Sequence, residues 1–354
     1  MNKMNSHLST IFATMQSTFR RRYLTIVCAI ILVFPLYFIV ISPTQSKHNV
    51  NNERITNLLK LAETKSFCSE KSVRRGFNQH VLSVSAYESN DRVELKTNLT
   101  WSYIHIFGKE AKKFYPSWVV RVYYYNLINK TADDIAELEK LYDNIDFCPV
   151  ENLPVLGNMK NKLPGKMQRF LSAIDPFVGV SMVRDLDSEI FEREVHAVDE
   201  WLSKTVYAFH IMRDHYLHNI EILGGLWGVA LNRLSFSDRL IMANALLPSD
   251  NENDVRKFYK TYAGAGDQTF LKDHIFSLAR HNSLAHDSFT CFWSRYVYRM
   301  DTRPFPTQRQ HPSCFVGCPK PCCTPELKQS RDYSSYTKCP SMCRPKEHDD
   351  WLFC

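Results

Sequence analysis

Short apolar runs alternate with amphipathic stretches through most of this chain. The runs at 80–87 (HVLSVSAY) and 118–125 (WVVRVYYY) are rich in β-branched and aromatic residues and predict the first strands of a sheet. Segment 131–142 has a helical pattern, and 144–149 (NIDFCP) predicts another short strand. This alternation predicts an α/β fold in which crossover helices connect the strands.

The same alternation continues through the second half of the chain. The pattern predicts a helix at 166–175, a strand from Val178, strand-like segments at 205–214 and 220–227, and helices at 237–247 and 268–280. Beyond residue 303 the apolar periodicity stops, and prolines and cysteines dominate. We therefore expect one α/β domain at 67–303 and a separate cysteine-rich tail at 304–354.

The strand from Val178 ends in the motif RDLDS (184–188) and passes directly into an amphipathic segment. Residues i and i+2 of a strand point to the same face, so Asp185 and Asp187 are expected to converge on one point. Mn²⁺ or Mg²⁺ could neutralise them there, with nucleotide phosphates completing the oxygen shell. Ser188 is a candidate N-cap of the following helix. The alternative is a pair of exposed acids at a strand end.

The N-terminal part of the chain predicts a membrane anchor. Residues 23–42 carry no charge and are long enough to cross roughly 30 Å of hydrocarbon. Segment 1–22 contains Lys3 and three consecutive arginines at 20–22 but no acid, so the positive-inside rule keeps it in the cytosol. This predicts a single-pass type II protein, with a short stem at 43–66 and the body in the lumen. A cleaved signal peptide is the alternative.

Cysteines and glycosylation sequons agree with a lumenal body in the Golgi or ER. The sequons begin at Asn98 and Asn129, and ten of the eleven cysteines follow the anchor. Cysteines usually pair in an oxidising compartment, so we expect disulfides in the tail, with structural zinc as the alternative. The net charge of +7 derives largely from the segment before residue 48, which argues against binding to nucleic acid.

Two further segments carry polar and glycine-rich motifs. The segment FHIMRDHYLHNIEILGGLWG (209–228) places Arg213 and Asp214 at a predicted strand end and Gly224 and Gly225 before Trp227. Glycines let a backbone approach a sugar closely, and an indole ring can stack on it. The alternative is a glycine-containing turn beside a core tryptophan. These elements lie where open α/β sheets bind their ligands.

Together these features resemble a known family. The type II anchor, the stem, RDLDS, MRDH…GGLWG and the later GDQTFL are similar to those of lumenal nucleotide-sugar glycosyltransferases of the GT-A fold, over about residues 81–291. In that family the first DxD acid, here Asp185, contacts the nucleotide ribose or the metal, and the last, Asp187, ligates the metal that bridges the diphosphate. The resemblance therefore implies a GT-A-like mixed sheet.

The resemblance also implies roles for other residues. A late histidine often supplies a further metal ligand, and His286 is the candidate, with His281 as the substitute. An acid near Asp267 often contacts the acceptor hydroxyl or acts as general base, although Asp267 could equally be a helix N-cap. Arg184 could contact phosphate or form a structural ion pair. Arg213, Asp214, Gly224, Gly225 and Trp227 complete the expected donor site.

The expected function is therefore metal-dependent transfer of a sugar from a nucleotide-sugar donor to a glycan or glycoprotein acceptor. One alternative is a catalytically inactive, lectin-like ectodomain with the same fold. A glycoside hydrolase is a third reading, but its two acids should lie roughly 5 to 9.5 Å apart across a cleft rather than at one point.

Overall fold

The computed structural model describes residues 52–62, 64–87, 93–127, 129–322 and 338–354, and residues 55–354 form one compact unit. The predicted cytosolic tail, the predicted anchor at 23–42 and the first part of the stem lie outside the described residues. Within the described ranges, no helix combines the length and the apolar character that a membrane crossing requires.

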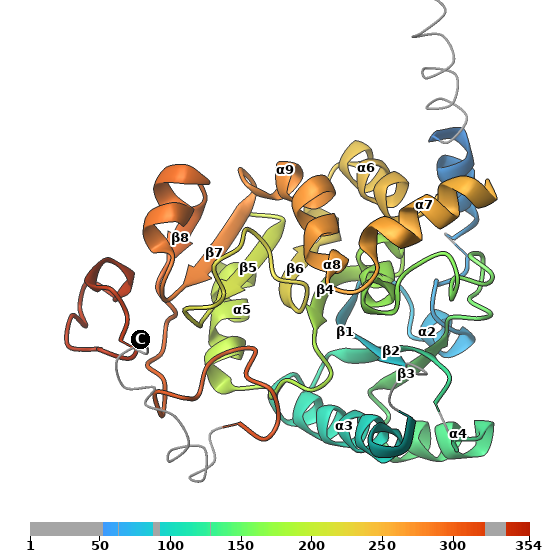
Figure 1. Cartoon of the computed structure of the whole chain (residues 1–354), viewed down its shortest axis with the longest axis horizontal. Coiled ribbons are helices and arrows are strands. Elements are labelled where there is room, and N and C mark those ends of the chain that lie inside the picture. Colours follow the sequence, from blue (N-terminus) through green and yellow to red (C-terminus); the bar gives the residue numbers. More distant parts are fainter. Residues whose placement is uncertain (1–51, 63, 88–92, 128, 323–337) are drawn as a thin grey trace, which may run out of the picture. The chain divides into compact units, whose positions relative to one another are not determined.

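The core of the unit is one eight-stranded mixed sheet (Figure 1). Its strands are β1 (Gln79–Tyr87), β2 (Val119–Tyr125), β3 (Ile145–Pro149), β4 (Val178–Arg184), β5 (Phe209–Arg213), β6 (Leu226–Ala230), β7 (Ser283–Asp287) and β8 (Asp301–Arg303). The strand order is β3-β2-β1-β4-β6-β5-β7-β8, and β6 is antiparallel to both of its neighbours. All other pairs are parallel, so β1, β2, β4, β5 and β7 end at the same edge.

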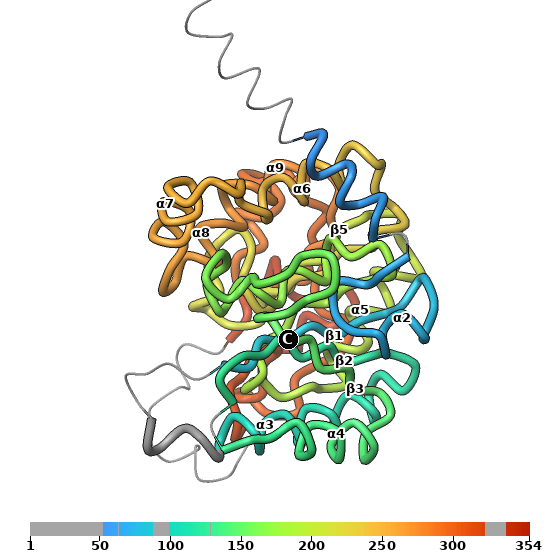
Figure 2. Tube along the Cα trace, turned by 90° about the vertical axis from the view of Figure 1, so that its right-hand side faces the viewer, coloured from blue at the N-terminus to red at the C-terminus, as the bar shows by residue number. Residues whose placement is uncertain are grey.

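Helices cover both faces of the sheet. They are α2 (Glu70–Arg74), α3 (Val93–Phe114), α4 (Ala132–Leu141), η2 (Gly165–Ile174), α5 (Glu192–Lys204), η3 (Leu231–Arg233), α6 (Phe236–Leu246), α7 (Glu252–Tyr262), α8 (Gly266–Phe270), η4 (Leu271–Ile275), α9 (Phe276–Ala279), η5 (Trp293–Val297) and η8 (Ser341–Cys343). Figure 1 shows α3 and α4 on one side of the sheet and α6 to α9 on the other, and Figure 2 shows the same division in a view turned by 90°.

Alternating strand residues fill two apolar layers, because successive side chains of a strand point to opposite faces. Val81 and Val183 lie in the layer beneath η2, α6 and α8, whereas Leu82 and Met182 lie in the layer beneath α3, α4 and α5. Both layers are fully buried along β4, which explains why the run before RDLDS is apolar except for Ser181.

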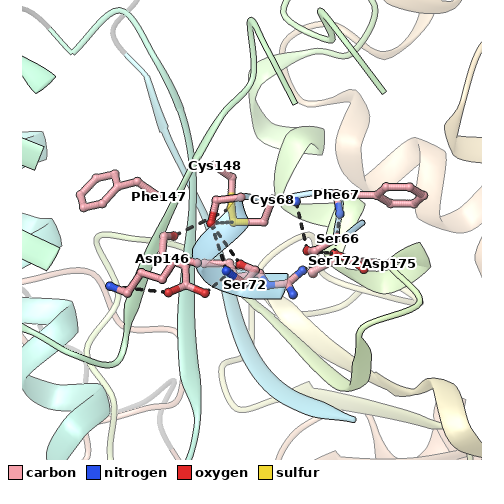
Figure 3. The surroundings of a disulfide bond; sticks show 12 residues. Ser66, Phe67, Cys68, Ser72, Asp146, Phe147, Cys148, Ser172 and Asp175 are labelled. Carbon is pink, nitrogen blue, oxygen red and sulfur yellow. Dashed lines mark hydrogen bonds and ion pairs between the residues drawn. A yellow bond between two sulfur atoms is a disulfide. The ribbon is translucent and has the colours of Figure 1, made fainter. Parts of the chain in front are cut away.

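The end of the predicted stem belongs to the compact unit. Residues 52–61 are helical, and Ile55 and Ala62 are completely buried in the core. Just after them, the side chain of Ser66 donates to Asp175 Oδ2 at 2.6 Å, and Cys68 forms a disulfide with Cys148 of β3 (Figure 3). The chain is therefore anchored to the body from residue 55 onward, before the predicted domain boundary at residue 67.

The predicted α/β class is confirmed, but several element boundaries differ. The predicted segment 220–227 is a loop as far as Gly225, because β6 begins at Leu226. The predicted helix at 268–280 is divided into α8, η4 and α9. The helix after RDLDS begins at Glu192 with Phe191 in the cap position, so the prediction of Ser188 as N-cap is wrong.

The cysteine-rich tail is disulfide-bonded, as predicted, and it also contributes to the core. Cys291 pairs with Cys343, Cys318 with Cys322, and Cys339 with Cys354. Phe305 and Val316 are completely buried in the apolar layer beneath α3 and α5. The tail between them therefore packs on the sheet domain by apolar contacts as well as by covalent links.

Candidate functional site

The predicted motifs meet at the edge of the sheet where the parallel strands end. β4 ends at Arg184 immediately before Asp185, and the glycine pair at 224–225 immediately precedes β6, the antiparallel neighbour of β4. The register pairs Arg184 with Leu226, which brings the first acid of RDLDS beside the glycines. Topology therefore assembles two motifs that lie about forty residues apart in the sequence.

A buried arginine connects the acids at this edge. Arg169 of η2 forms an ion pair with Asp185 through Nη1 and a second, of 3.1 Å, with Asp267 through Nη2. Its Nη1 also donates to the main-chain oxygen of Arg184 at 3.0 Å. Burial opposes the charge on this guanidinium, but the two carboxylates outweigh it and raise its pKa. Arg169 thus fixes Asp185 and Asp267 in one cluster.

Positions 224 and 225 require glycine because the main chain there passes very close to the carboxylates of Asp267 and Asp185. A Cβ atom on Gly225 would lie 2.1 Å from Asp185 Oδ2, and one on Gly224 would lie 2.2 Å from Asp267 Oδ2. Both distances are far below van der Waals contact, so any side chain here would displace a carboxylate. The glycine pair therefore sits directly against the Arg169 cluster.

The two acids of RDLDS differ in environment. The Asp185 side chain is 47% exposed; burial raises its pKa, but Arg169 outweighs burial and the net shift is downward. Asp187 is exposed on a turn closed by the hydrogen bond from Ser188 N to Asp185 O. Partial burial and the neighbouring charge of Asp185 both raise the pKa of Asp187. The pair interacts electrostatically, although Asp187 lies on a turn rather than on a continued strand.

Asp267 lies inside helix α8 rather than capping it. The cap position is Ala265, which makes no side-chain hydrogen bond, and the Asp267 side chain is only 6% exposed. Its carboxylate instead faces Arg169, beside Gly224. The interpretation of Asp267 as a helix cap is therefore excluded, and the acid belongs to the cluster at the sheet edge.

Arg184, Arg213 and Asp214, which were expected to bind the donor, instead form buried ion pairs within the fold. Arg184 pairs with Glu194 of α5, on the opposite face of the sheet from Asp185. Arg213 pairs with Asp287 at 2.8 Å. Each of these side chains is almost completely buried, and for Arg184 the structure shows the ion pair that was one of its two expected roles.

Asp214 is the most heavily bonded acid in this group. It accepts two hydrogen bonds of 2.9 Å from Arg193 and further ones from Arg309, Ser288 and the Val316 main chain. Burial alone would raise the pKa of Asp214, but Arg193 and Arg309 hold it well below its ordinary value. Its oxygens are therefore occupied by protein donors that join α5, the loop after β7 and the tail.

Trp227 and His286 are both buried and have partners inside the fold. Trp227 is 1% exposed and packs edge-on against Phe170, so its ring faces the core rather than a ligand. His286 is completely buried in β7, where Nδ1 is 2.8 Å from His210 Nε2 and Nε2 is 3.4 Å from Glu200 Oε2. The rings of both residues are therefore held by neighbours inside the protein.

Within the described residues, no third His, Cys, Asp or Glu side chain forms a group of close ligand atoms with the two aspartates. There, the group of three His, Cys, Asp or Glu side chains with ligand atoms close together is Asp287, Cys291 and Cys343. Both cysteines of that group form a disulfide with each other and cannot ligate an ion as thiolates. A metal at RDLDS would therefore rely on carboxylate oxygens, water and a bound ligand.

A separate cavity of about 660 Å³ lies between β8 and the C-terminal segment. Its lining includes Glu200, Arg303 and Trp351, and it contains none of the residues predicted to bind donor or metal. The acid cluster and this cavity therefore lie in different places.

Sequence reasoning missed Arg169 and the contribution of the tail. Arg169 sits in a short segment of 3₁₀ helix without any motif, sixteen residues before Asp185. The available signal was the need of buried carboxylates for a counter-ion, which predicts a basic residue near Asp185 and Asp267. No protein-family model matches this chain, and no curated protein matches it either.

Proposed function

We propose that this protein is a metal-dependent glycosyltransferase of GT-A-like fold. It would transfer a sugar from a nucleotide-sugar donor to a glycan or glycoprotein acceptor in the Golgi or ER lumen, as a type II membrane protein. The observation that carries the proposal is the acid cluster at the sheet edge. Asp185, Asp187 and Asp267 contribute three negative charges and Arg169 one positive charge, which leaves a net charge of −2 when all are ionised.

The net negative charge of the cluster and its carboxylate oxygens are suited to a divalent cation. Carboxylate oxygens are the ligands that Mg²⁺ and Mn²⁺ prefer, and Mg²⁺ commonly uses one or two carboxylates together with substrate phosphates. Asp185 is half-exposed and Asp187 is exposed, so both can reach such an ion. The ion would stabilise the negative charge that develops on the diphosphate leaving group.

Asp267 is the candidate base for the acceptor hydroxyl. Arg169 pairs with it at 3.1 Å through Nη2, and the backbone of Gly224 packs directly against its Oδ2. An ionised carboxylate placed beside a nucleophilic hydroxyl can accept its proton during transfer. Arg169 also pairs with Asp185. The acid proposed for the donor side, Asp185, and the acid proposed for the acceptor side, Asp267, therefore share one cationic partner.

The test is a panel of nucleotide sugars incubated with the full-length chain in detergent and Mn²⁺, with released nucleoside diphosphate as the readout. We expect one donor to be hydrolysed slowly without an acceptor and faster with a glycan acceptor, and we expect EDTA to stop both reactions. If turnover in EDTA equals turnover in Mn²⁺, the metal mechanism is wrong.

A metal-independent, lectin-like binding module is the second candidate. It is favoured by one observation: Arg169 already gives Asp185 a counter-ion within the protein. Asp267→Asn separates the two functions, because the amide still accepts from Arg169 but cannot take a proton. A transferase predicts nearly unchanged donor binding and a transfer rate lower by about 10²-fold or more. A wild-type protein that binds donor or glycan without turnover would support the binding module.

A further inference from the structure

The tail runs beside the turn that carries Asp187 and is hydrogen-bonded to its main chain. Lys320 N donates to Asp187 O at 2.6 Å, and Glu189 N donates to Cys318 O at 3.2 Å. Between these bonds, Ser188 and Pro319 form an antiparallel bridge. The turn therefore has the tail as a partner on one side, although more than 125 residues separate them in the sequence.

The side chain of Lys320 strengthens this contact. Its Nζ donates to Ser188 O at 2.6 Å and is 3.2 Å from Glu110 Oε2 of α3. The side chain is only 5% exposed, and a buried ammonium is costly unless it is paired and hydrogen-bonded. Lys320 thus ties the turn to α3 on the sheet domain.

Neighbouring tail residues contact the MRDH motif (212–215) and the GGLWG motif (224–228). Phe315 stacks on His215, the last residue of MRDH, with ring centroids 4.3 Å apart. A Cβ on Gly317 would lie 2.7 Å from Leu226, the residue after the glycine pair. The disulfide between Cys318 and Cys322 closes the loop that contains Lys320. One tail segment, 315–322, therefore contacts RDLDS, MRDH and GGLWG.

We infer that segment 315–322 holds the proposed metal-binding turn, 185–189, in place, and that Lys320 is the positioning residue for Asp187. We call this segment the clasp. A metal ligand must be held in its productive geometry by surrounding contacts, since ordering a free turn on binding costs conformational entropy. The clasp removes that cost by ordering 185–189 before the ion arrives. This inference rests on the proposed function for its metal, but the order of the turn can be measured without any ligand.

The experiment compares the full-length wild type with Lys320→Met and with Lys320→Met/Glu110→Gln. The double variant removes the uncompensated Glu110 charge and should recover most of the stability that the single variant loses. Two readouts are used: amide hydrogen exchange of 185–190 without ligand, and binding of Mn²⁺ alone, followed by the paramagnetic signal of the free ion. Both variants should exchange faster in 185–190 and bind Mn²⁺ about tenfold more weakly, which corresponds to about 1.4 kcal/mol.

Lys71→Met is the matched control. Lys71 also donates from Nζ to a main-chain oxygen, that of Ile145 at 2.6 Å, but at the opposite edge of the sheet. It should lower stability and leave Mn²⁺ binding and exchange of 185–190 unchanged. Lys320→Arg should restore part of the Mn²⁺ affinity, because it keeps a cationic donor.

The outcomes separate the clasp from the proposed function. Unchanged exchange of 185–190 in both Lys320 variants would overturn the clasp, whether or not the protein binds metal. Faster exchange with wild-type Mn²⁺ affinity would show that the clasp orders the turn without positioning a ligand, and would overturn the role of Lys320. If the wild type binds no Mn²⁺ in the absence of nucleotide, the positioning role of Lys320 is overturned, and the donor panel in Mn²⁺ tests the proposed function separately. Faster exchange would still show that the tail orders the turn.

Discussion

Two Arg-Asp pairs end strands of the same sheet, Arg184-Asp185 on β4 and Arg213-Asp214 on β5, yet their aspartates differ in environment. Asp214 is completely buried and accepts from two arginines, a serine and a main-chain amide. Asp185 is half-exposed and has one charged partner, which it shares with Asp267. The same dipeptide thus serves structure at one strand end and remains open to a ligand at the other. Exposure and the number of donors distinguish the two roles.

The largest effect should follow Asp214→Asn. This change leaves Arg193 and Arg309 buried without a counter-ion, and breaking a buried ion pair typically costs about 3–5 kcal/mol. Urea unfolding should show the loss as a lower midpoint with an unchanged slope. Asp185→Asn, at the half-exposed end, should cost only about 1 kcal/mol. Equal losses would contradict the distinction between the two strand ends.

The reverse pattern is expected for activity. Asp187→Asn should lower the transfer rate by about 10²- to 10³-fold, because removal of one group that stabilises developing charge has effects of this size. The melting temperature should stay near that of the wild type, since Asp187 is exposed. Asp143→Asn, another exposed acid, is the control and should change neither quantity. A stable Asp187→Asn protein with the full transfer rate would contradict the role of Asp187 in the site.

A smaller effect is expected from the glycine beside Asp185. Gly225→Ala places a methyl group 2.1 Å from Asp185 Oδ2, so the carboxylate must move. Mn²⁺ affinity measured by calorimetry should fall about tenfold. Gly157→Ala is the control: its φ of 67° is strained for alanine, but no atom lies within 4 Å of the added Cβ. It should lower stability and leave Mn²⁺ affinity unchanged.

A further expected effect concerns pH. Burial is the main cause that lowers the pKa of His215 and of His218 from 6.5 to about 4. Between pH 6.5 and about 4 these histidines are protonated in the unfolded chain but neutral in the folded chain. The free energy of unfolding should therefore fall as the pH falls through this window. The melting temperature of His218→Gln should depend less steeply on pH there. An NMR titration of His218 with a midpoint near 6.5 would contradict this expectation.

The strands were predictable from the sequence because their apolar runs are long and bounded, as at 80–87 and 118–125. The sequence predicted that Asp185 and the glycine pair lie at the same edge of the sheet, because both follow or precede strands there, but it did not predict their direct contact. The roles of Arg213 and Asp214 were not predictable, because their partners Asp287, Arg193 and Arg309 lie far away in sequence. His286 was assigned from the family resemblance, and its ring is held by His210 and Glu200 instead.

The measurement that tests the central claim most directly is a calorimetric titration of nucleoside diphosphate into full-length protein, with and without Mn²⁺. The probes are UDP and GDP, and the variants are Asp187→Asn and Asp143→Asn. The account predicts Mn²⁺-dependent binding of one diphosphate to the wild type and to Asp143→Asn, and binding at least tenfold weaker to Asp187→Asn. Equal affinity with and without Mn²⁺, or equal affinity in Asp187→Asn and the wild type, would contradict it.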